Sequence, residues 1–239
     1  MNLVLDQWTK KDYSEFIYLL KSKQDIGYKK FHEKLVPGKD NIIGIRSPIS
    51  KGISKEISKG NWRSFLKFSG TEYYEEIFIK GQVIGLAKTD YEEFIRLVDG
   101  YVPLIDNWAI CDSFSGCLKQ TRRYELDFFQ HIKEFLFSEQ SWKIRTGLII
   151  MLSHYLKDDY INEIINLCDG VKNDDYYVRM GQAWLISICY IKFPDITGHY
   201  LENESTLDKW TYNKSITKIT ESLRIDDETK KYLKTLKKS

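Results

Sequence analysis

The sequence lacks any long hydrophobic run, and this absence argues against a membrane-spanning segment. Its apolar runs, such as Leu148 to Leu152, are far shorter than the roughly 20 residues that cross a bilayer. Residues 1–11 also lack the charged and then apolar pattern of a secretory signal peptide. We therefore expect a soluble, cytoplasmic protein without a membrane partner.

An excess of one charge is also missing. The 239 residues include 36 Lys and Arg against 34 Asp and Glu, which gives a formal net charge of only +2. The total charge therefore does not indicate a nucleic-acid partner, and any basic surface must arise from local clustering. The hydrophobic content of 42% is ordinary for a globular protein, and the length suffices for one large domain or one repeat array.

Motifs for metal, cofactor and acyl-transfer chemistry are absent. The four cysteines form no C-x-x-C pair, and no histidine stands near them at zinc-finger spacing, so we expect reduced cysteines packed in the core. The four histidines form no H-E-x-x-H pair. The glycines between positions 27 and 44 match neither G-x-G-x-x-G nor a phosphate-binding loop. We expect no bound metal and no cofactor.

Proline and glycine are few, with 4 and 14 residues, and apolar residues recur at three- and four-residue spacing rather than in alternation. This pattern predicts an all-α fold. Capping residues divide the chain into helices with short connections, and each helix has one apolar face to bury. Such helix pairs are typical of an α-α superhelix, a solenoid of HEAT-like helical repeats. We expect residues 1–239 to form a single domain of roughly six helix pairs.

Several helix positions follow from capping residues. Asp6 is expected to begin the first helix, Thr71 a helix over residues 72–88, and Asp106 a helix that contains Trp108. Later helices are predicted over residues 124–137, 139–156, 160–171, 174–193, 207–223 and 227–237.

A helix that begins at Asp106 brings Trp108 and Asp112 together, because residues four apart lie on one face. An indole and a carboxylate then share a small patch, and Lys119, Arg122 and Arg123 follow closely as positive charge able to hold phosphate. This combination indicates a candidate site. The alternative is that Asp112 caps a helix, forms an ion pair or is solvated, as carboxylates on helices usually are.

Charged residues on other predicted helices have simpler interpretations. Ser47 and Pro48 open a helix in which Lys51, Lys55 and Lys59 follow at four-residue spacing, and this basic stripe is read either as a binding surface or as a solvated face. The adjacent acids at positions 75 and 76 are expected to be exposed or to cap a helix.

Aromatic and basic residues recur together in the second half of the chain. Such pairs can stack on bases and contact phosphates. For Trp142 and Trp210 we favour packing between helices, because aromatic side chains bury so much area. The pairs are Trp142 with Arg145, Arg179 with Trp184, and Trp210 with Lys218.

Six blocks of the sequence resemble, in the same order, those of the AlkD-like DNA alkylation repair family. That family is built from HEAT-like helical repeats and removes cationic N3- and N7-alkylated purines from DNA. The resemblance therefore implies a DNA glycosylase that acts on double-stranded DNA containing alkylated purines, and we expect it to act as a monomer. The blocks are residues 41–48, 73–76, 105–112, 141–145, 174–184 and 212–222.

The resemblance also implies roles for single residues. Trp108 and Asp112 match the family's catalytic aromatic and acid, and Trp184 matches a second aromatic wall beside the lesion. Arg145 matches a phosphate-binding arginine, and an early tyrosine corresponds to Tyr28, with Phe31 as the alternative. The predicted DNA-binding surface also includes Arg46, Lys51, Lys55, Arg122, Arg179 and Lys218.

The sequence departs from the family pattern at two places. Ile144 stands where many members have a second arginine, and Met180-Gly181 stands where many have Lys-Ala, which lowers local charge or helix propensity. The alternative function is a non-catalytic helical-repeat scaffold that binds DNA or a protein, since a fold does not determine a function. The presence of Asp112 favours the enzyme.

Overall fold

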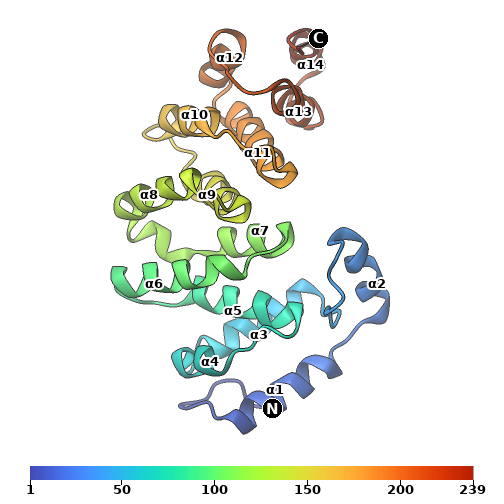
Figure 1. The fold of residues 1–239 in the computed structure, drawn as a ribbon, viewed down its shortest axis with the longest axis vertical. Helices are drawn as coiled ribbons and strands as arrows, with labels where there is room; N and C mark the ends of the chain where they lie inside the picture. The colour runs from blue at the N-terminus through green and yellow to red at the C-terminus, as the bar shows by residue number, and fades with distance from the viewer. Residues whose placement is uncertain (239) are drawn as a thin grey trace. The chain divides into compact units, whose positions relative to one another are not determined.

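The computed structural model describes residues 1–238 and confirms the predicted all-α fold of helical repeats (Figure 1). Helices make up 70% of the chain, and the described residues contain no strand. The chain divides into two compact units, Met1–Tyr124 and the residues from Glu125 on. The helices of the first unit are α1 (Lys10–Ser22), α2 (Ile26–Leu35), α3 (Ser47–Ile57), α4 (Trp62–Phe68), α5 (Tyr74–Leu86), α6 (Tyr91–Tyr101), η1 (Val102–Leu104), α7 (Trp108–Cys117) and η2 (Lys119–Arg122).

The first unit is organised around α5. Nearly every residue of α5 is buried, including the polar Glu75, Glu76 and Gln82, because neighbouring helices cover it on several sides. Helices α3, α6 and α7 pack against it, and α1 packs against α4. The contact between α5 and α7 matters most for the candidate site, since α7 contains Trp108 and Asp112.

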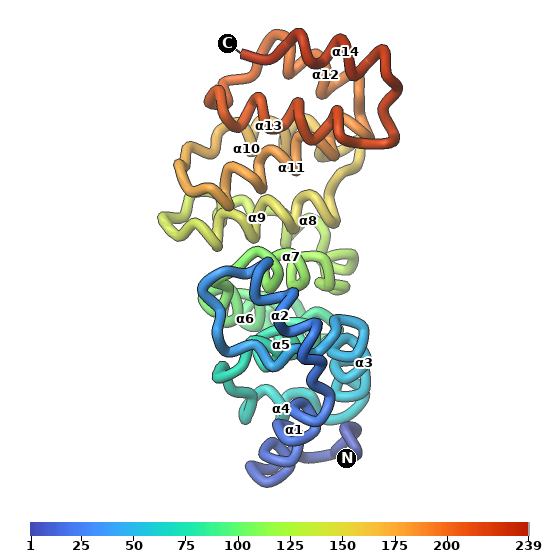
Figure 2. Tube along the Cα trace, turned by 90° about the vertical axis from the view of Figure 1, so that its right-hand side faces the viewer, coloured from blue at the N-terminus to red at the C-terminus, as the bar shows by residue number. Residues whose placement is uncertain are grey.

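The second unit consists of stacked helix pairs. Helices α9, α11 and α13 lie one above another in Figure 2, and α11 contacts both of the others. Helices α8, α10 and α12 contact the members of this row, so the unit alternates two rows of helices as helical repeats do. Its elements are α8 (Glu125–Lys133), η3 (Glu134–Phe137), α9 (Ser141–His154), α10 (Ile161–Gly170), α11 (Tyr176–Lys192), α12 (Pro194–Asn203), α13 (Lys209–Thr220) and α14 (Asp227–Thr235).

The structure corrects several predicted helix positions. Helix α1 begins after Thr9 rather than after Asp6, because Thr9 and Asp12 form a reciprocal capping box. Helix α5 begins two residues later than predicted. Tyr73 is the residue that precedes its first turn, and the Tyr73 amide donates a hydrogen bond to the Glu76 carboxylate within that turn. Helix α12 was not among the predicted helices, although a proline at its first position is a typical helix start.

The departure from the family pattern at Gly181 leads to a stability prediction. A methyl group at Gly181 on α11 would lie 3.4 Å from Leu148 Cδ1 and 3.5 Å from Arg145 Nη1, which is ordinary contact. Gly181→Ala should therefore raise the free energy of unfolding by about 0.5–1 kcal/mol, because alanine favours the helix and restricts the unfolded chain. Urea denaturation of the two proteins measures this difference.

Gly147 on α9 provides the matched control, since it is also a buried glycine within a helix. A methyl group there would lie 3.0 Å from Leu136 Cδ2 and 3.1 Å from Phe135 Cβ, which is crowded. Gly147→Ala should therefore leave the free energy of unfolding unchanged or lower it by about 1 kcal/mol. A stabilised Gly147→Ala together with a destabilised Gly181→Ala would contradict the packing described here.

Candidate functional site

Helix α7 carries the central pair of the candidate site. Asn107 caps it, with its side-chain oxygen accepting a hydrogen bond of 3.0 Å from the Ile110 amide. The predicted spacing is confirmed: Trp108 and Asp112 lie on one helix, four residues apart, and both are half-buried. The capping residue differs from the prediction, because Asp106 instead pairs with Lys39.

The end of α2 holds the Trp108 side chain in place. The indole Nε1 donates a hydrogen bond of 2.9 Å to the carbonyl oxygen of Leu35, the last residue of α2. Carbonyls in the last turn of a helix have no partner within the helix, so this bond satisfies both groups. The ion pair between Lys39 and Asp106 adds a second link between the same two segments. The ring of Trp108 is therefore fixed relative to α2.

Tyr28 and Arg46 come together beside the N-terminus of α2. Asp25 caps this helix by accepting a 2.9 Å hydrogen bond from the Tyr28 amide, and Arg46 Nη2 lies 2.8 Å from the same carboxylate. These two contacts lower the pKa of Asp25, the hydrogen bond most and the guanidinium next. The Arg46 guanidinium lies 5.5 Å from the centre of the Tyr28 ring, while the ring of Phe31 is 6.4 Å from that of Tyr28 and more exposed. The aromatic and the cation thus form one pair.

Glu75 holds the loop that leads into Arg46. Its carboxylate accepts three backbone hydrogen bonds, from Ile43 (2.8 Å), Gly44 (2.7 Å) and Ile45 (3.0 Å). Gly44 has a φ of +99°, a conformation that favours glycine. The prediction that Glu75 is exposed or caps a helix is wrong, since Glu75 is only 2% exposed and its carboxylate binds this loop. The neighbouring Glu76 does cap α5, by accepting from the Tyr73 amide.

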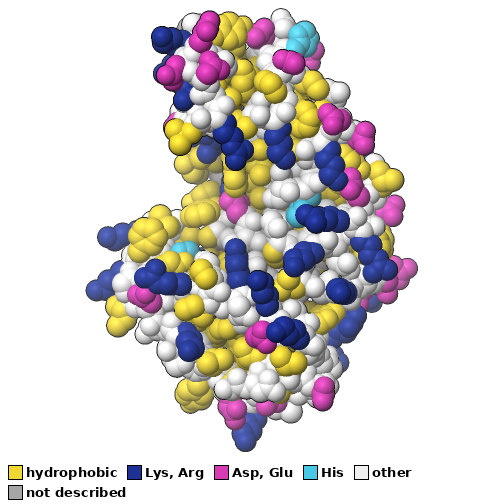
Figure 3. All heavy atoms as spheres, turned by 180° about the vertical axis from the view of Figure 1, so that it is seen from behind, with side chains coloured by type: hydrophobic (Ala, Val, Ile, Leu, Met, Phe, Trp, Pro, Cys, Tyr) yellow, Lys and Arg dark blue, Asp and Glu magenta, His cyan; other side chains and the backbone are white. Residues whose placement is uncertain are grey.

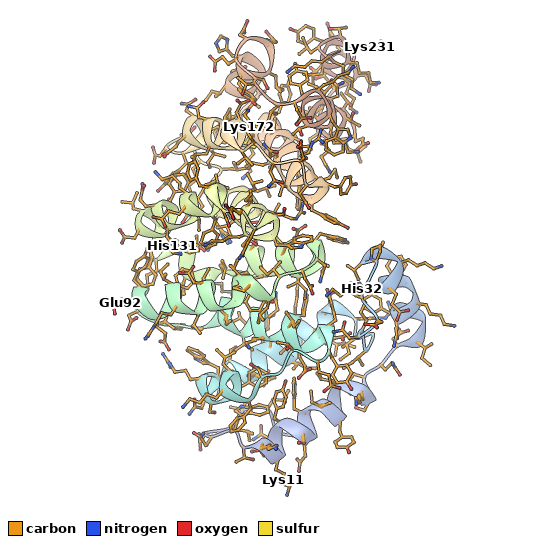
Figure 4. The ribbon with its side chains drawn as sticks, viewed as in Figure 1. Lys11, His32, Glu92, His131, Lys172 and Lys231 are labelled. Atoms are coloured by element: carbon orange, nitrogen blue, oxygen red, sulfur yellow. The ribbon has the colours of Figure 1, made fainter. Side chains whose placement is uncertain are left out.

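His32 on α2 (labelled in Figure 4) supports Tyr28 from within the helix. Its ring stacks on Tyr28 with centroids 5.5 Å apart and meets the edge of Tyr74 at 4.9 Å. Burial lowers the pKa of His32, and its Nε2 makes no hydrogen bond within the described residues. The neutral ring is therefore the form that the fold favours.

This arrangement predicts a pH dependence of stability. Because the folded pKa of His32 lies below its unfolded value of about 6.5, the unfolded chain binds the proton more tightly, and stability falls as the pH drops through that value. The free energy of unfolding of His32→Gln should change less between about pH 7 and pH 5 than that of the wild type. Urea denaturation at several pH values tests this, and NMR titration of the His32 ring provides a direct check. A measured pKa above that of a free histidine would contradict it.

Exposed cations lie on α3 and η2 of the first unit. Lys51, Lys55 and Arg122 all have exposed side chains, and Figure 3 shows Lys and Arg side chains gathered over this unit on the face that it draws. Burial raises the pKa of the Cys117 thiol to about 12, against the opposing effect of the positive charges of Lys51 and Lys119. The third lysine of the predicted stripe, Lys59, pairs with Glu56 at 2.6 Å.

In the second unit, Arg145 lies against the start of α11. The residue is only 4% exposed, and Nη1 donates a 2.7 Å hydrogen bond to the Tyr177 carbonyl. The Trp142 ring packs on the Tyr177 ring with centroids 4.9 Å apart, which confirms its predicted role in packing between helices. Trp184 is half-buried two turns further along α11. Ile144 is buried, so this departure from the family pattern lies in the core.

Arg179 connects α11 to α13. Its guanidinium pairs with Asp208, donates from Nε to Thr211 Oγ1 at 3.2 Å and lies 4.7 Å from the centre of the Trp210 ring. Trp210 is 38% exposed, so the prediction that it packs between helices holds only for the ring face on Arg179. Lys218, one of the predicted DNA contacts, is half-buried on α13.

Sequence reasoning missed Glu75, Leu35 and Lys39 as residues that position the site. Their contacts join segments about 30 to 70 residues apart in the chain, so no local pattern indicates them. No group of three or more metal-ligating side chains occurs within residues 1–238. In the same part of the chain, no helix is long and apolar enough to cross a bilayer.

Residues 14–219 match the family described as DNA alkylation repair enzyme. The chain belongs to this family, and its role is the repair of alkylated DNA. The comparison with curated proteins found no match to the chain.

Proposed function

We propose that the protein is a DNA glycosylase that removes cationic N3- and N7-alkylated purines from double-stranded DNA. The observation that carries this proposal is the pair on α7: a carboxylate four residues from an indole that the end of α2 holds in place. Membership of the DNA alkylation repair family supplies the substrate class, alkylated DNA.

The proposed chemistry needs little from the protein at the base. An alkylated purine that already carries a positive charge leaves with the electron pair of the glycosidic bond and becomes neutral, so no acid has to protonate it. The sugar then develops an oxocarbenium-like charge at C1′. The Asp112 carboxylate offsets this charge and orients a water molecule, which adds to C1′ and releases its proton to the solvent. Trp108 offers an aromatic face to the same cation. Trp184, which the resemblance matches to an aromatic residue beside the lesion, is proposed to contact the DNA from the second unit.

The other predicted residues are proposed to contact the DNA backbone. The pair of Tyr28 and Arg46, which Asp25 and the Glu75-bound loop hold, presents an aromatic ring and a cation together. We propose that the family match, which runs through both compact units, reflects a single repair domain that acts as a cytoplasmic monomer without metal or cofactor. The remaining proposed phosphate contacts are Lys51, Lys55, Arg122, Arg179 and Lys218. Arg145 was also predicted to bind phosphate, but it is only 4% exposed and bonds the Tyr177 carbonyl, so we propose that it positions the start of α11 instead.

Phosphate contacts by α3 predict a change in salt dependence. In a double variant, Lys51→Gln with Lys55→Gln, the binding constant should depend less steeply on salt. The absolute slope of log K against log salt should fall by roughly 1.8, since each phosphate contact contributes roughly 0.9. Fluorescence anisotropy with an undamaged duplex at several salt concentrations measures the slope. Lys59→Gln is the control, because Lys59 already pairs with Glu56. An equal change in the control would refute a specific role for the stripe.

The lesion spectrum tests the proposed reaction. Purified protein is incubated with duplexes that differ in one base: 7-methylguanine, uracil or unmodified guanine. We expect free base only from the 7-methylguanine duplex, because a neutral base is a poor leaving group unless an acid protonates it. Release of uracil at a similar rate would overturn the proposed mechanism. Binding without release of any base would favour the non-catalytic scaffold.

A further inference from the structure

A groove of about 650 Å³ lies along α13 in the second unit, a volume typical of sites for small ligands. Three cations line it, against the single acid Asp208, which already pairs with Arg179 and caps α13. The groove is therefore positively charged. Its lining residues are Arg179, Asp208, Lys209, Trp210, Asn213, Lys214 and Thr217.

An exposed indole forms part of this groove. Trp210 is 38% exposed, whereas Trp8 in the core of the first unit is 1% exposed. The Trp210 ring is nevertheless oriented, because the Arg179 guanidinium lies 4.7 Å from its centre and the exposed Tyr176 meets it at 5.8 Å with an interplanar angle of 60°. The exposed part of this oriented ring is therefore available to stack on a flat ligand.

Further polar groups continue from the indole along α13. Lys237 Nζ donates a hydrogen bond of 2.9 Å to Thr217 Oγ1, which adds a cation at the end of the groove opposite Trp210. The backbone of Lys238 exchanges two 2.9 Å hydrogen bonds with the Asn213 side chain, so the segment that contributes this cation is tied to α13. Trp210 and Thr217 are seven residues apart, or roughly 10 Å along the helix.

We propose that this groove binds a nucleotide whose base is unpaired. The base stacks on Trp210, and the phosphates contact the ammonium groups of Lys209, Lys214 and Lys237. Within a duplex the faces of the bases are covered by their neighbours, so only an unstacked base can use the indole. This binding goes beyond the excision of alkylated purines and does not depend on it. A single-stranded stretch of nucleic acid and a free mononucleotide present the same chemistry.

The test measures binding of dye-labelled oligothymidine to the full chain by fluorescence anisotropy. Trp210→Ala should weaken binding by roughly ten- to hundredfold, and Trp210→Phe should restore most of it, because each base stacked on an aromatic ring contributes on that scale. Phe137→Ala is the matched control, since Phe137 is an exposed aromatic residue of the same unit outside the groove. Its affinity should match that of the wild type.

A second arm keeps the protein intact and changes the ligand. An oligonucleotide with the same phosphates but abasic sugars should bind the wild type as weakly as oligothymidine binds Trp210→Ala. Equal binding of the abasic and thymidine strands, or an unchanged affinity of Trp210→Ala, would overturn the proposal. Competition by thymidine monophosphate distinguishes the sources: displacement at millimolar concentration identifies a free nucleotide, and its failure identifies a strand. Wild-type excision is measured separately, so either proposal can fail alone.

Discussion

Asp112→Asn should lower the single-turnover rate of base excision by about a hundredfold or more, because one preorganised charge beside a transition state contributes a few kcal/mol. The substitution keeps the shape of the side chain and removes its charge. Binding to a duplex with 7-methylguanine should stay within a few-fold of the wild type, since the phosphate contacts are unchanged. The measurement pairs single-turnover kinetics with a binding isotherm.

Glu92→Gln is the matched control for this substitution. Glu92 is an exposed acid on α6 of the same unit (labelled in Figure 4), so the variant loses an equal charge away from α7. Its excision rate should match that of the wild type. If Asp112 has only a structural role, Asp112→Asn would instead lower the melting temperature and reduce binding and excision together. That result would remove Asp112 from the mechanism.

Glu75→Ala should lower the free energy of unfolding by about 3–5 kcal/mol. The substitution removes the acceptor of three buried backbone amides, and each buried donor without a partner costs about 1–3 kcal/mol before relaxation. The loop that contains Gly44 should open first, which would release Arg46 from its position beside Tyr28. Hydrogen exchange of the amides of residues 43–45 and urea denaturation measure the local and the global effect.

Two variants make the Glu75 result specific. Glu72→Ala removes an exposed acid just before α5 and should change stability by less than about 0.5 kcal/mol. Glu75→Gln keeps one acceptor oxygen but places a donating NH2 group beside the backbone amides. Its free energy of unfolding should therefore lie between those of Glu72→Ala and Glu75→Ala. Unchanged protection of residues 43–45 in Glu75→Ala would show that the carboxylate does not hold this loop.

The helix that carries the candidate pair was predictable because its signals are local. A capping residue followed by apolar residues at helical spacing set the register of Trp108 and Asp112, which the structure confirms. The cap itself was wrong by one residue, since Asp106 and Asn107 are both good capping residues. The contact that decides between them, from Lys39 to Asp106, joins positions 67 residues apart.

The supporting contacts were not predictable from the sequence for the same physical reason. A glutamate at the start of a helix is usually exposed, and nothing near Glu75 indicates that a loop about 30 residues away donates three amides to it. Trp210 shows the opposite error. Its size favours burial, but packing of one face on Arg179 leaves the remainder of the ring in solvent.

The central claim is that this chain hydrolyses the glycosidic bond of an alkylated purine, with the Asp112 carboxylate stabilising the developing sugar cation. The most direct test is release of free 7-methylguanine from a duplex under single-turnover conditions, with wild type and Asp112→Asn measured side by side. The account predicts free base and an abasic site with the wild type, and a rate lower by about a hundredfold or more with a folded, DNA-binding Asp112→Asn. Equal rates for the two proteins, or no release by a wild type that binds the duplex, would contradict it.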